Sequence, residues 1–187
     1  YRIYGQPLEY LWRAPSIRSW EKAYRAGECD EIQGIFWNSK PVEELYDTEN
    51  DPWEVNNLAD NPEYKEVLER MRAANVEWIK SINDCGFIPE AELTALAGET
   101  ARYDYMRSGN VEIDQLVEAA ESSTLATAED IPGLIDYLED ESSAIRYWGA
   151  TGLLILGEDA EPAKEDLMSL LNDNSRSVKV VAAEALY

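Results

Sequence analysis

The sequence predicts a mainly α-helical protein, with a small β-hairpin or sheet among the helices of its N-terminal half and an α-solenoid of helical repeats in its C-terminal half. Three observations predict this fold. Apolar residues recur at helical spacing along most of the chain. Two short apolar runs flank a polar turn near residue 39. A pattern beyond residue 130 recurs after 33 residues.

The first predicted helix covers residues 14–27. Pro15 suits the first turn of a helix, and Gly27 suits its C-terminal cap. One face of this helix is apolar and carries Ile17, Trp20 and Tyr24. Another face is a basic stripe formed by Arg18, Lys22 and Arg25. We therefore expect a short amphipathic helix.

A hairpin, a loop and a long helix are predicted next. Apolar residues on both sides of Asn38-Ser39-Lys40-Pro41 predict a β-hairpin between residues 32 and 47. Residues 47–60 are rich in Asp, Asn and Pro, whose side chains stabilise turns, so they should form an ordered loop. Asp60-Asn61-Pro62-Glu63 then signals the start of a helix that continues to Asn83. The apolar side of this helix must pack against a hydrophobic surface.

The chain length of 187 residues accommodates one domain or two small ones, and we expect two. Residues 1–90 form the first predicted domain, with a helix, a β-hairpin and a long helix. Few large apolar residues occur between residues 91 and 102, so we place a linker there. Residues 103–187 form the second predicted domain.

The second predicted domain contains an internal repeat. Leu134-Ile135-Asp136-Tyr137-Leu138 matches Leu167-Met168-Ser169-Leu170-Leu171, and the same offset of 33 residues places Asp140 on Asp173. The order of helix, Asp-containing turn and second helix resembles HEAT-like repeats, in which each helix pair buries its face against its neighbours. Clear units are expected at about 131–156 and 162–187, with a degenerate unit at about 103–126.

The strong acidity of the chain excludes two classes of partner. Its net charge is −22, and such a surface repels phosphate backbones and anionic lipid. We therefore expect no nucleic-acid partner and no membrane partner. The first residues lack the features of a signal peptide, and no apolar run is long enough to span a bilayer. Because Met is absent at the start and the last helical pattern is unfinished, we expect that both ends are cut from a longer protein.

One stretch of the chain resembles a known family. Residues 40–59, with Glu44-Leu45-Tyr46-Asp47 near the centre, resemble the segment that closes the catalytic domain of sulfatases. Three further stretches, at residues 8–13, 18–27 and 86–92, are similar to the tail of heparan N-sulfatase-like bacterial sulfatases of the alkaline-phosphatase-like superfamily. The resemblance covers residues 1–93 and implies a small sheet and helix that pack on an α/β catalytic domain. Some such enzymes carry a HEAT-like extension.

The resemblance also implies a function for the parent protein. The parent would hydrolyse sulfate esters or N-sulfates of sulfated sugars, such as glycosaminoglycans, in the periplasm or outside the cell. It would use formylglycine and calcium, and the missing catalytic domain would be the first partner of this chain. A sulfated carbohydrate would be the substrate, and a protein could bind the helical repeats.

We expect no catalytic residue, no metal ligand and no cofactor in this chain itself. The chain has no histidine, which removes the commonest general base and zinc ligand. Formylglycine forms from the first residue of a Cys/Ser-x-Pro/Ala-x-Arg motif, and neither Cys29 nor Cys85 begins one, so we carry over no nucleophile. These two cysteines could form one disulfide or remain free. An EF-hand starting at Asp47 fails, because Pro52 stands where the loop needs Gly.

The weak candidates for substrate binding are Arg18, Lys22 and Arg25, which could contact sulfate or carboxylate groups of a sugar chain. The alternative is a solvated basic face. The many Trp and Tyr side chains could likewise form a carbohydrate platform or a packed core. Carboxylates around Asp140 are better explained as helix caps than as acid and base.

Three functional hypotheses follow. The chain could be a non-catalytic C-terminal part of a sulfatase, a stand-alone HEAT-repeat module for protein–protein interaction, or an unrecognised enzyme. The first hypothesis predicts an exposed hydrophobic patch on residues 1–90, where the catalytic domain would bind. The second predicts a partner along the repeats, and the third requires turnover by the isolated chain.

Overall fold

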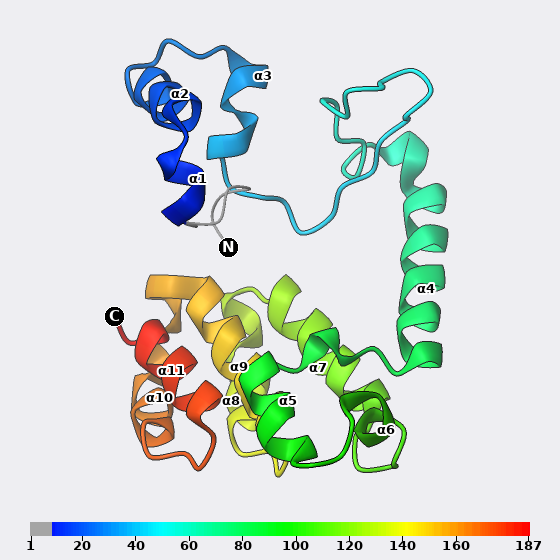
Figure 1. The fold of residues 1–187 in the computed structure, drawn as a ribbon, viewed down its shortest axis with the longest axis vertical. Coiled ribbons are helices and arrows are strands. Elements are labelled where there is room, and N and C mark those ends of the chain that lie inside the picture. Colours follow the sequence, from blue (N-terminus) through cyan, green and yellow to red (C-terminus); the bar gives the residue numbers. More distant parts are fainter. Residues whose placement is uncertain (1–8) are drawn as a thin grey trace. The chain divides into compact units, whose positions relative to one another are not determined.

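The computed structural model describes residues 9–187, which form helices and loops without β-strands (Figure 1). The prediction of a mainly α-helical fold is confirmed. Contacts divide the chain into two compact units, one ending at Leu68 and the other running from Glu69 to Tyr187. Residues 1–8 lie outside the described residues, so neither the prediction about a signal peptide nor the contribution of Leu8 to the sulfatase-like stretch is placed.

The first unit begins with helices α1 (Glu9–Arg13) and α2 (Pro15–Arg25). The helix predicted at residues 14–27 is confirmed as α2. Pro15 stands in its first turn, where a missing N–H leaves no hydrogen bond unmade. Gly27 follows the helix with a φ of +72°, a conformation that glycine adopts without strain.

The predicted β-hairpin is wrong, because residues 31–37 are helical instead. Helix α3 (Glu31–Gly34) continues directly into the 3₁₀ turn η1 (Ile35–Trp37). Asp30 and Gln33 form a reciprocal cap, in which Asp30 Oδ1 accepts from Gln33 N at 2.8 Å and Gln33 Oε1 accepts from Asp30 N at 3.0 Å. This capping box satisfies two backbone N–H groups, which in a hairpin would bond to the neighbouring strand. It therefore starts a helix.

An ordered loop follows, as predicted. Asn57 fixes it from within, since its Oδ1 accepts from Leu45 N at 2.9 Å and its Nδ2 donates to Glu43 O at 3.0 Å. The Leu58 N–H also donates to the Leu45 carbonyl at 2.7 Å. Side-chain hydrogen bonds to the backbone therefore replace the β-ladder that the apolar alternation predicted.

The predicted long helix is confirmed as η2 (Pro62–Tyr64) followed by α4 (Lys65–Ile82). Asn61 caps its start by accepting from Glu63 N at 3.0 Å. Asn83 ends it with a φ of +52°, a conformation that asparagine adopts more readily than most residues. No residue of α4 is buried, and Met71 and Trp78 are 53% and 58% exposed. Val76, Ile79 and Ile82 on the apolar side of this helix are half-buried.

The second unit consists of helices joined by short turns. They are η3 (Cys85–Phe87), α5 (Glu90–Ala97), α6 (Arg102–Met106), α7 (Ile113–Leu125), η4 (Ala128–Asp130), α8 (Ile131–Leu138), α9 (Ser143–Leu156), η5 (Gly157–Ala163), α10 (Lys164–Leu170) and α11 (Arg176–Ala185). The range predicted as a linker, 91–102, thus contains most of α5, whose Leu93 is 3% exposed. The predicted domain limits stay a prediction.

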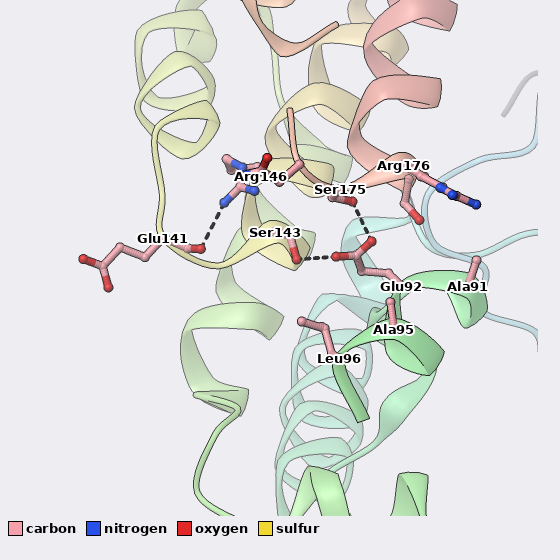
Figure 2. Close-up of a pocket in the computed structure, with 11 residues that line it drawn as sticks. Ala91, Glu92, Ala95, Leu96, Glu141, Ser143, Arg146, Ser175 and Arg176 are labelled. Atoms are coloured by element: carbon pink, nitrogen blue, oxygen red, sulfur yellow. Dashed lines mark hydrogen bonds between the residues drawn. The ribbon is translucent and has the colours of Figure 1, made fainter. Parts of the chain in front are cut away.

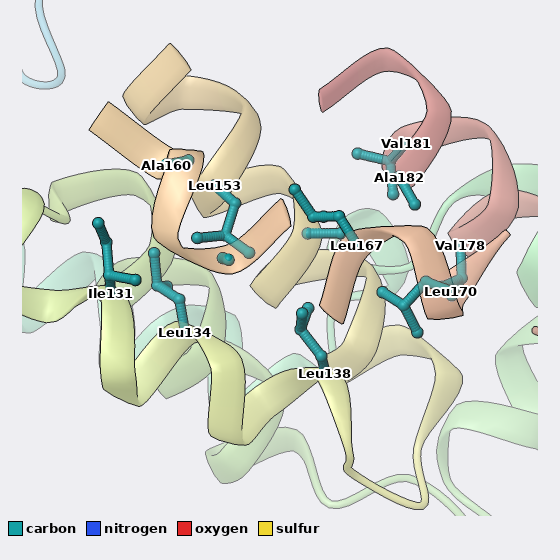
Figure 3. Close-up of a cluster of buried hydrophobic side chains, with 12 residues drawn as sticks. Ile131, Leu134, Leu138, Leu153, Ala160, Leu167, Leu170, Val178, Val181 and Ala182 are labelled. Carbon is teal, nitrogen blue, oxygen red and sulfur yellow. The ribbon is translucent and has the colours of Figure 1, made fainter. Parts of the chain in front are cut away.

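Two helix pairs, α8–α9 and α10–α11, share one hydrophobic core (Figure 3). Its fully buried members include Leu134, Leu153 and Leu167. Gly149 allows α9 to approach α8 closely, since a Cβ there would lie 2.8 Å from Tyr137 Cβ and 2.9 Å from the Leu134 carbonyl oxygen. The helices occupy the positions that the 33-residue offset predicts. That they form a HEAT-like solenoid stays a prediction.

Candidate functional site

An aromatic cluster organises the first unit. Trp37, only 8% exposed, lies at its centre, with its ring centroid 5.5 Å from that of Trp20 and 6.0 Å from that of Tyr24. Trp12 meets the edge of Trp37 at 6.3 Å, and Phe36 stacks on Trp20 at 5.0 Å. Because the rings pack on one another, this geometry favours a packed core over an open platform for sugars.

The polar atoms of this cluster are mostly satisfied within it. Trp12 Nε1 donates to Glu21 Oε2 at 2.8 Å, and Trp20 Nε1 donates to the Gln33 carbonyl at 2.9 Å. Tyr24 Oη donates to Asn38 Oδ1 at 3.0 Å. The buried Trp37 Nε1 has no acceptor among the described residues.

The basic stripe lies on the exposed side of α2, as predicted. Arg25 is engaged by Glu21, with 2.7 Å between Arg25 Nη2 and Glu21 Oε1. Hydrogen bonds from Arg25 and Trp12 hold the pKa of Glu21 below its ordinary value. Arg18 and Lys22 are exposed and form no ion pair with any residue from 9 to 187. The role of the stripe in substrate binding stays a prediction.

The most sulfatase-like stretch forms a local turn. Asp47 Oδ1 accepts from the backbone N–H groups of Glu49 and Asn50, each at 3.2 Å, and its Oδ2 accepts from Asn50 Nδ2 at 2.8 Å. The hydrogen bonds from Asn50 hold the pKa of Asp47 below its ordinary value. Asp47 therefore acts as the cap of its own turn.

The described residues do not fit the calcium or formylglycine that the family resemblance implies. No group of three or more Cys, Asp or Glu side chains in residues 9–187 is arranged to hold a metal ion. Cys29 is half-buried and Cys85 is exposed, and both are free thiols. No step of sulfate hydrolysis can be derived through either cysteine.

One string of residues does fit the formylglycine motif, although we expected no such nucleophile in this chain. Ser142-Ser143-Ala144-Ile145-Arg146 matches Cys/Ser-x-Pro/Ala-x-Arg, with Ser142 in the position of the nucleophile. Ser142 is the residue immediately before α9, and its N–H donates to Asp140 Oδ1 at 2.7 Å. The string thus marks the start of a repeat helix, and the 33-residue offset places Ser175 and Lys179 at the same two positions of the next unit.

The arginine of that string binds the turns of two successive helix pairs. Arg146 Nε lies 2.7 Å from Asp173 Oδ2, and Arg146 Nη2 lies 3.0 Å from Asp173 Oδ1. Arg146 Nη1 donates to the carbonyls of Asp140 and Glu141 at 2.7 and 3.0 Å. Since all three nitrogens bind the turns, the guanidinium is held there rather than at Ser142.

A buried carboxylate occupies the open pocket between α5, α9 and α11 (Figure 2). Glu92 is 6% exposed, and its two oxygens accept from Ser143 Oγ and from Ser175 Oγ, each at 2.5 Å. Ser143 is the first residue of α9, and Ser175 is the N-cap of α11. The positive ends of two helix dipoles therefore face one carboxylate that the chain itself supplies.

Sequence reasoning missed Glu92, because it lies in the range predicted as a linker. The available signal was the serine that recurs at the start of the second helix of each unit, Ser142 and Ser175. Ser175 caps its helix by accepting from Val178 N at 3.2 Å, whereas Ser142 makes no such hydrogen bond and its neighbour Ser143 binds Glu92. Both serine hydroxyls of the pocket donate to the same carboxylate, and both serines lie at helix starts, so the arrangement is suited to docking α5 on α9 and α11.

Comparison with known proteins places part of this chain beside sulfatases. It is 37% identical over 91 residues to an ulvan-active sulfatase of Formosa agariphila, and this match covers 48% of the chain but 15% of that protein. It is 46% identical over 46 residues to another ulvan-active sulfatase of the same organism, covering 25% of the chain and 9% of that protein. No family model and no solved structure matches the chain. About half of the chain is thus similar to a short segment of a sulfatase.

Proposed function

We propose that the chain is a non-catalytic, C-terminal part of a sulfatase. The observation that carries this proposal is the similarity to two ulvan-active sulfatases, which spans at most 15% of either protein. A segment of 91 residues is shorter than an α/β catalytic domain, so the rest of such an enzyme would carry the chemistry. The parent protein would release sulfate from a sulfated polysaccharide, with ulvan as the first substrate to test.

The chemistry of the chain supports a non-catalytic role. It has no histidine, and Ser142, the residue at the start of the motif-like string, belongs to a repeat turn whose arginine is bound to Asp173. Formylglycine and calcium would therefore reside in the catalytic domain of the parent. By the same resemblance, the parent would act in the periplasm or outside the cell.

Exposed apolar side chains support docking on a catalytic domain. Trp53 is 85% exposed in the loop after the sulfatase-like core, and Trp78 is 58% exposed on α4. Large aromatic side chains of this kind are enriched in protein interfaces and contribute much of their binding energy. We infer that they contact the catalytic domain of the parent.

The basic stripe would then be the part of this chain that meets substrate. Arg18 and Lys22 are exposed cations in a strongly acidic chain, and sulfate groups attract such charges. Replacing both with glutamine should reduce retention on immobilised ulvan at low salt, whereas Arg13→Gln, on α1, should not. Equal retention of all three proteins would assign the stripe to solvent.

A hybrid enzyme tests the proposal. The matching segment of the Formosa agariphila sulfatase is replaced by the similar segment of this chain, and sulfate release from ulvan is measured. We expect the hybrid to retain activity, and a second hybrid with Trp37→Asp to lose it, because the aromatic cluster would not form. An inactive first hybrid that is folded and carries formylglycine would contradict the proposal.

The second candidate function is a stand-alone helical-repeat module for protein–protein interaction. The acidic helix pairs favour it, because Met168 and Val180 of the last pair are 54% and 65% exposed. It predicts that the chain binds no sulfatase catalytic domain and that the hybrid is inactive.

A further inference from the structure

The last helix pair leaves exposed four positions whose equivalents in the preceding pair are buried or partly buried. In the preceding pair, Leu138 is 5% exposed, Ala150 is 0% exposed, and Ile135 and Tyr147 pack against the same hydrophobic core. This core also contains residues of α10 and α11, and α11 packs on α9 while α10 packs on α8. Each of them has an equivalent 33 residues later.

The four equivalent positions form one exposed face on α10 and α11. Met168 is 54% exposed, Leu171 is 41% exposed and Val180 is 65% exposed. Ala183, which corresponds to the fully buried Ala150, is also exposed. We call these four residues the terminal face. They are apolar and exposed, whereas their counterparts in the preceding pair are buried or partly buried.

Lys179 on α11 provides a second observation, because its equivalent in the preceding helix pair forms an ion pair. Arg146 of the preceding pair binds Asp173 in the turn of α10–α11. The 33-residue offset places Lys179 at the position of Arg146. Lys179 is half-buried, its charge helps to lower the pKa of Asp173, and it forms no direct ion pair within residues 9–187. Because Arg146 binds the aspartate in the turn of the next helix pair, we expect Lys179 to bind a carboxylate in the turn of a further pair.

We propose that the terminal face binds a further helix pair of the same 33-residue pattern, joined in tandem, with an aspartate in its turn paired to Lys179. Two kinds of contact support this occupant. Apolar packing and the ion pair between Arg146 and Asp173 hold α10–α11 on α8–α9, and the terminal face and Lys179 offer the same two kinds of contact to a further pair. In arrays of this kind a repeat is stabilised chiefly by its neighbours, so the added pair should stabilise α10 and α11.

An extended chain tests this inference. Residues 155–187 are repeated once after Tyr187, which keeps the 33-residue spacing and places a copy of Asp173 opposite Lys179. We expect the midpoint of thermal unfolding to rise by at least about 5 °C, and amide exchange in α11 to slow at least about tenfold. Val180→Asp in the extended chain should abolish both gains, because it places a charge in the new interface.

Matched variants separate docking from general effects. Val180→Asp in the original chain should change the unfolding midpoint by less than about 2 °C, since this side chain is exposed. Leu125→Asp, on the exposed end of α7, should leave the gain of the extended chain intact. Lys179→Glu should lower the midpoint of thermal unfolding by more in the extended chain than in the original chain.

Two outcomes would overturn the inference. The first is an extended chain with an unchanged midpoint, or with a gain that Val180→Asp leaves intact. The second is a concentration-dependent dimer of the original chain in sedimentation experiments that Val180→Asp disperses, which would assign the terminal face to a second copy of the chain.

Discussion

Arg146 and Asp173 join the turns of two successive helix pairs through a bidentate ion pair, with atom separations of 2.7 and 3.0 Å. Their side chains are 15% and 7% exposed. Because Arg146 also holds two carbonyls of its own turn, the pair fixes the second helix pair on the first. The contact links sequence positions 27 residues apart, at the same side of the repeat as the Glu92 carboxylate.

Breaking this ion pair should destabilise the helical repeats strongly. Asp173→Ala leaves a largely buried guanidinium without its carboxylate, and we expect a loss of about 3 kcal/mol in the free energy of unfolding. Urea unfolding followed by circular dichroism measures it. The double variant Arg146→Met with Asp173→Leu should lose less than the sum of the two single variants. A double variant as unstable as that sum would show that the two side chains act independently.

The same ion pair predicts a dependence of stability on pH. Burial raises the pKa of Asp173, but hydrogen bonds from Arg146 and the Ser175 N–H outweigh burial, and the pKa lies below its ordinary value. Its contribution is therefore fully present above the unfolded pKa of about 3.9 and is lost as the pH falls through the folded pKa. We expect the difference in unfolding midpoint between the original chain and Asp173→Asn to be constant near neutral pH and to shrink in acid. A difference that grows in acid would contradict the ion pair.

Glu92 should hold α5 on the starts of α9 and α11. Glu92→Gln removes the charge that both serines bind and should cost about 1–2 kcal/mol. Hydrogen exchange should then accelerate in α5 more than in α9. Glu90→Gln on the same helix is the control, because Glu90 is exposed and its replacement should change neither rate. Equal exchange rates in α5 for the Glu92→Gln and Glu90→Gln variants would remove Glu92 from this role.

Two glycines of the same helix pair should respond in opposite directions to alanine. Gly149→Ala places a Cβ 2.8 Å from Tyr137 Cβ, so α9 must move away from α8, at a cost of about 1–3 kcal/mol. Gly133→Ala on α8 meets nothing within 4 Å and should stabilise the helix by about 0.5–1 kcal/mol. Thermal unfolding of both variants checks this, and a shift of the same sign in both would contradict the close approach of α8 and α9.

The helices of the second unit could be predicted from sequence because their signal is local and repeated. The apolar period and the 33-residue offset place α8 to α11 of the second unit. In the first unit, Pro15, Gly27 and Asn61 mark helix ends by backbone chemistry. The hairpin failed for a local reason as well. Ile35, Phe36 and Trp37 are typical strand residues, but the capping box of Asp30 and Gln33 precedes them and starts a helix.

The polar contacts of the second unit could not be predicted in the same way. Glu92 binds Ser175, which is 83 residues away in sequence, and no local pattern reports such a pair. Few large apolar residues surround Glu92, so the segment had the composition of a linker although Leu93 anchors it in a core. The string at Ser142–Arg146 was overlooked for a related reason, since its meaning depends on the repeat in which it lies.

Sulfate release by the purified chain is the most direct test of a non-catalytic role. The substrates are ulvan, a sulfated glycosaminoglycan fragment and an aryl sulfate, and the Formosa agariphila sulfatase serves as the positive control. We predict no release by this chain or by its Ser142→Ala variant, and release by the chain fused behind a sulfatase catalytic domain whether or not Ser142 is replaced. Release by the chain alone that Ser142→Ala abolishes would contradict the account and make Ser142 the nucleophile.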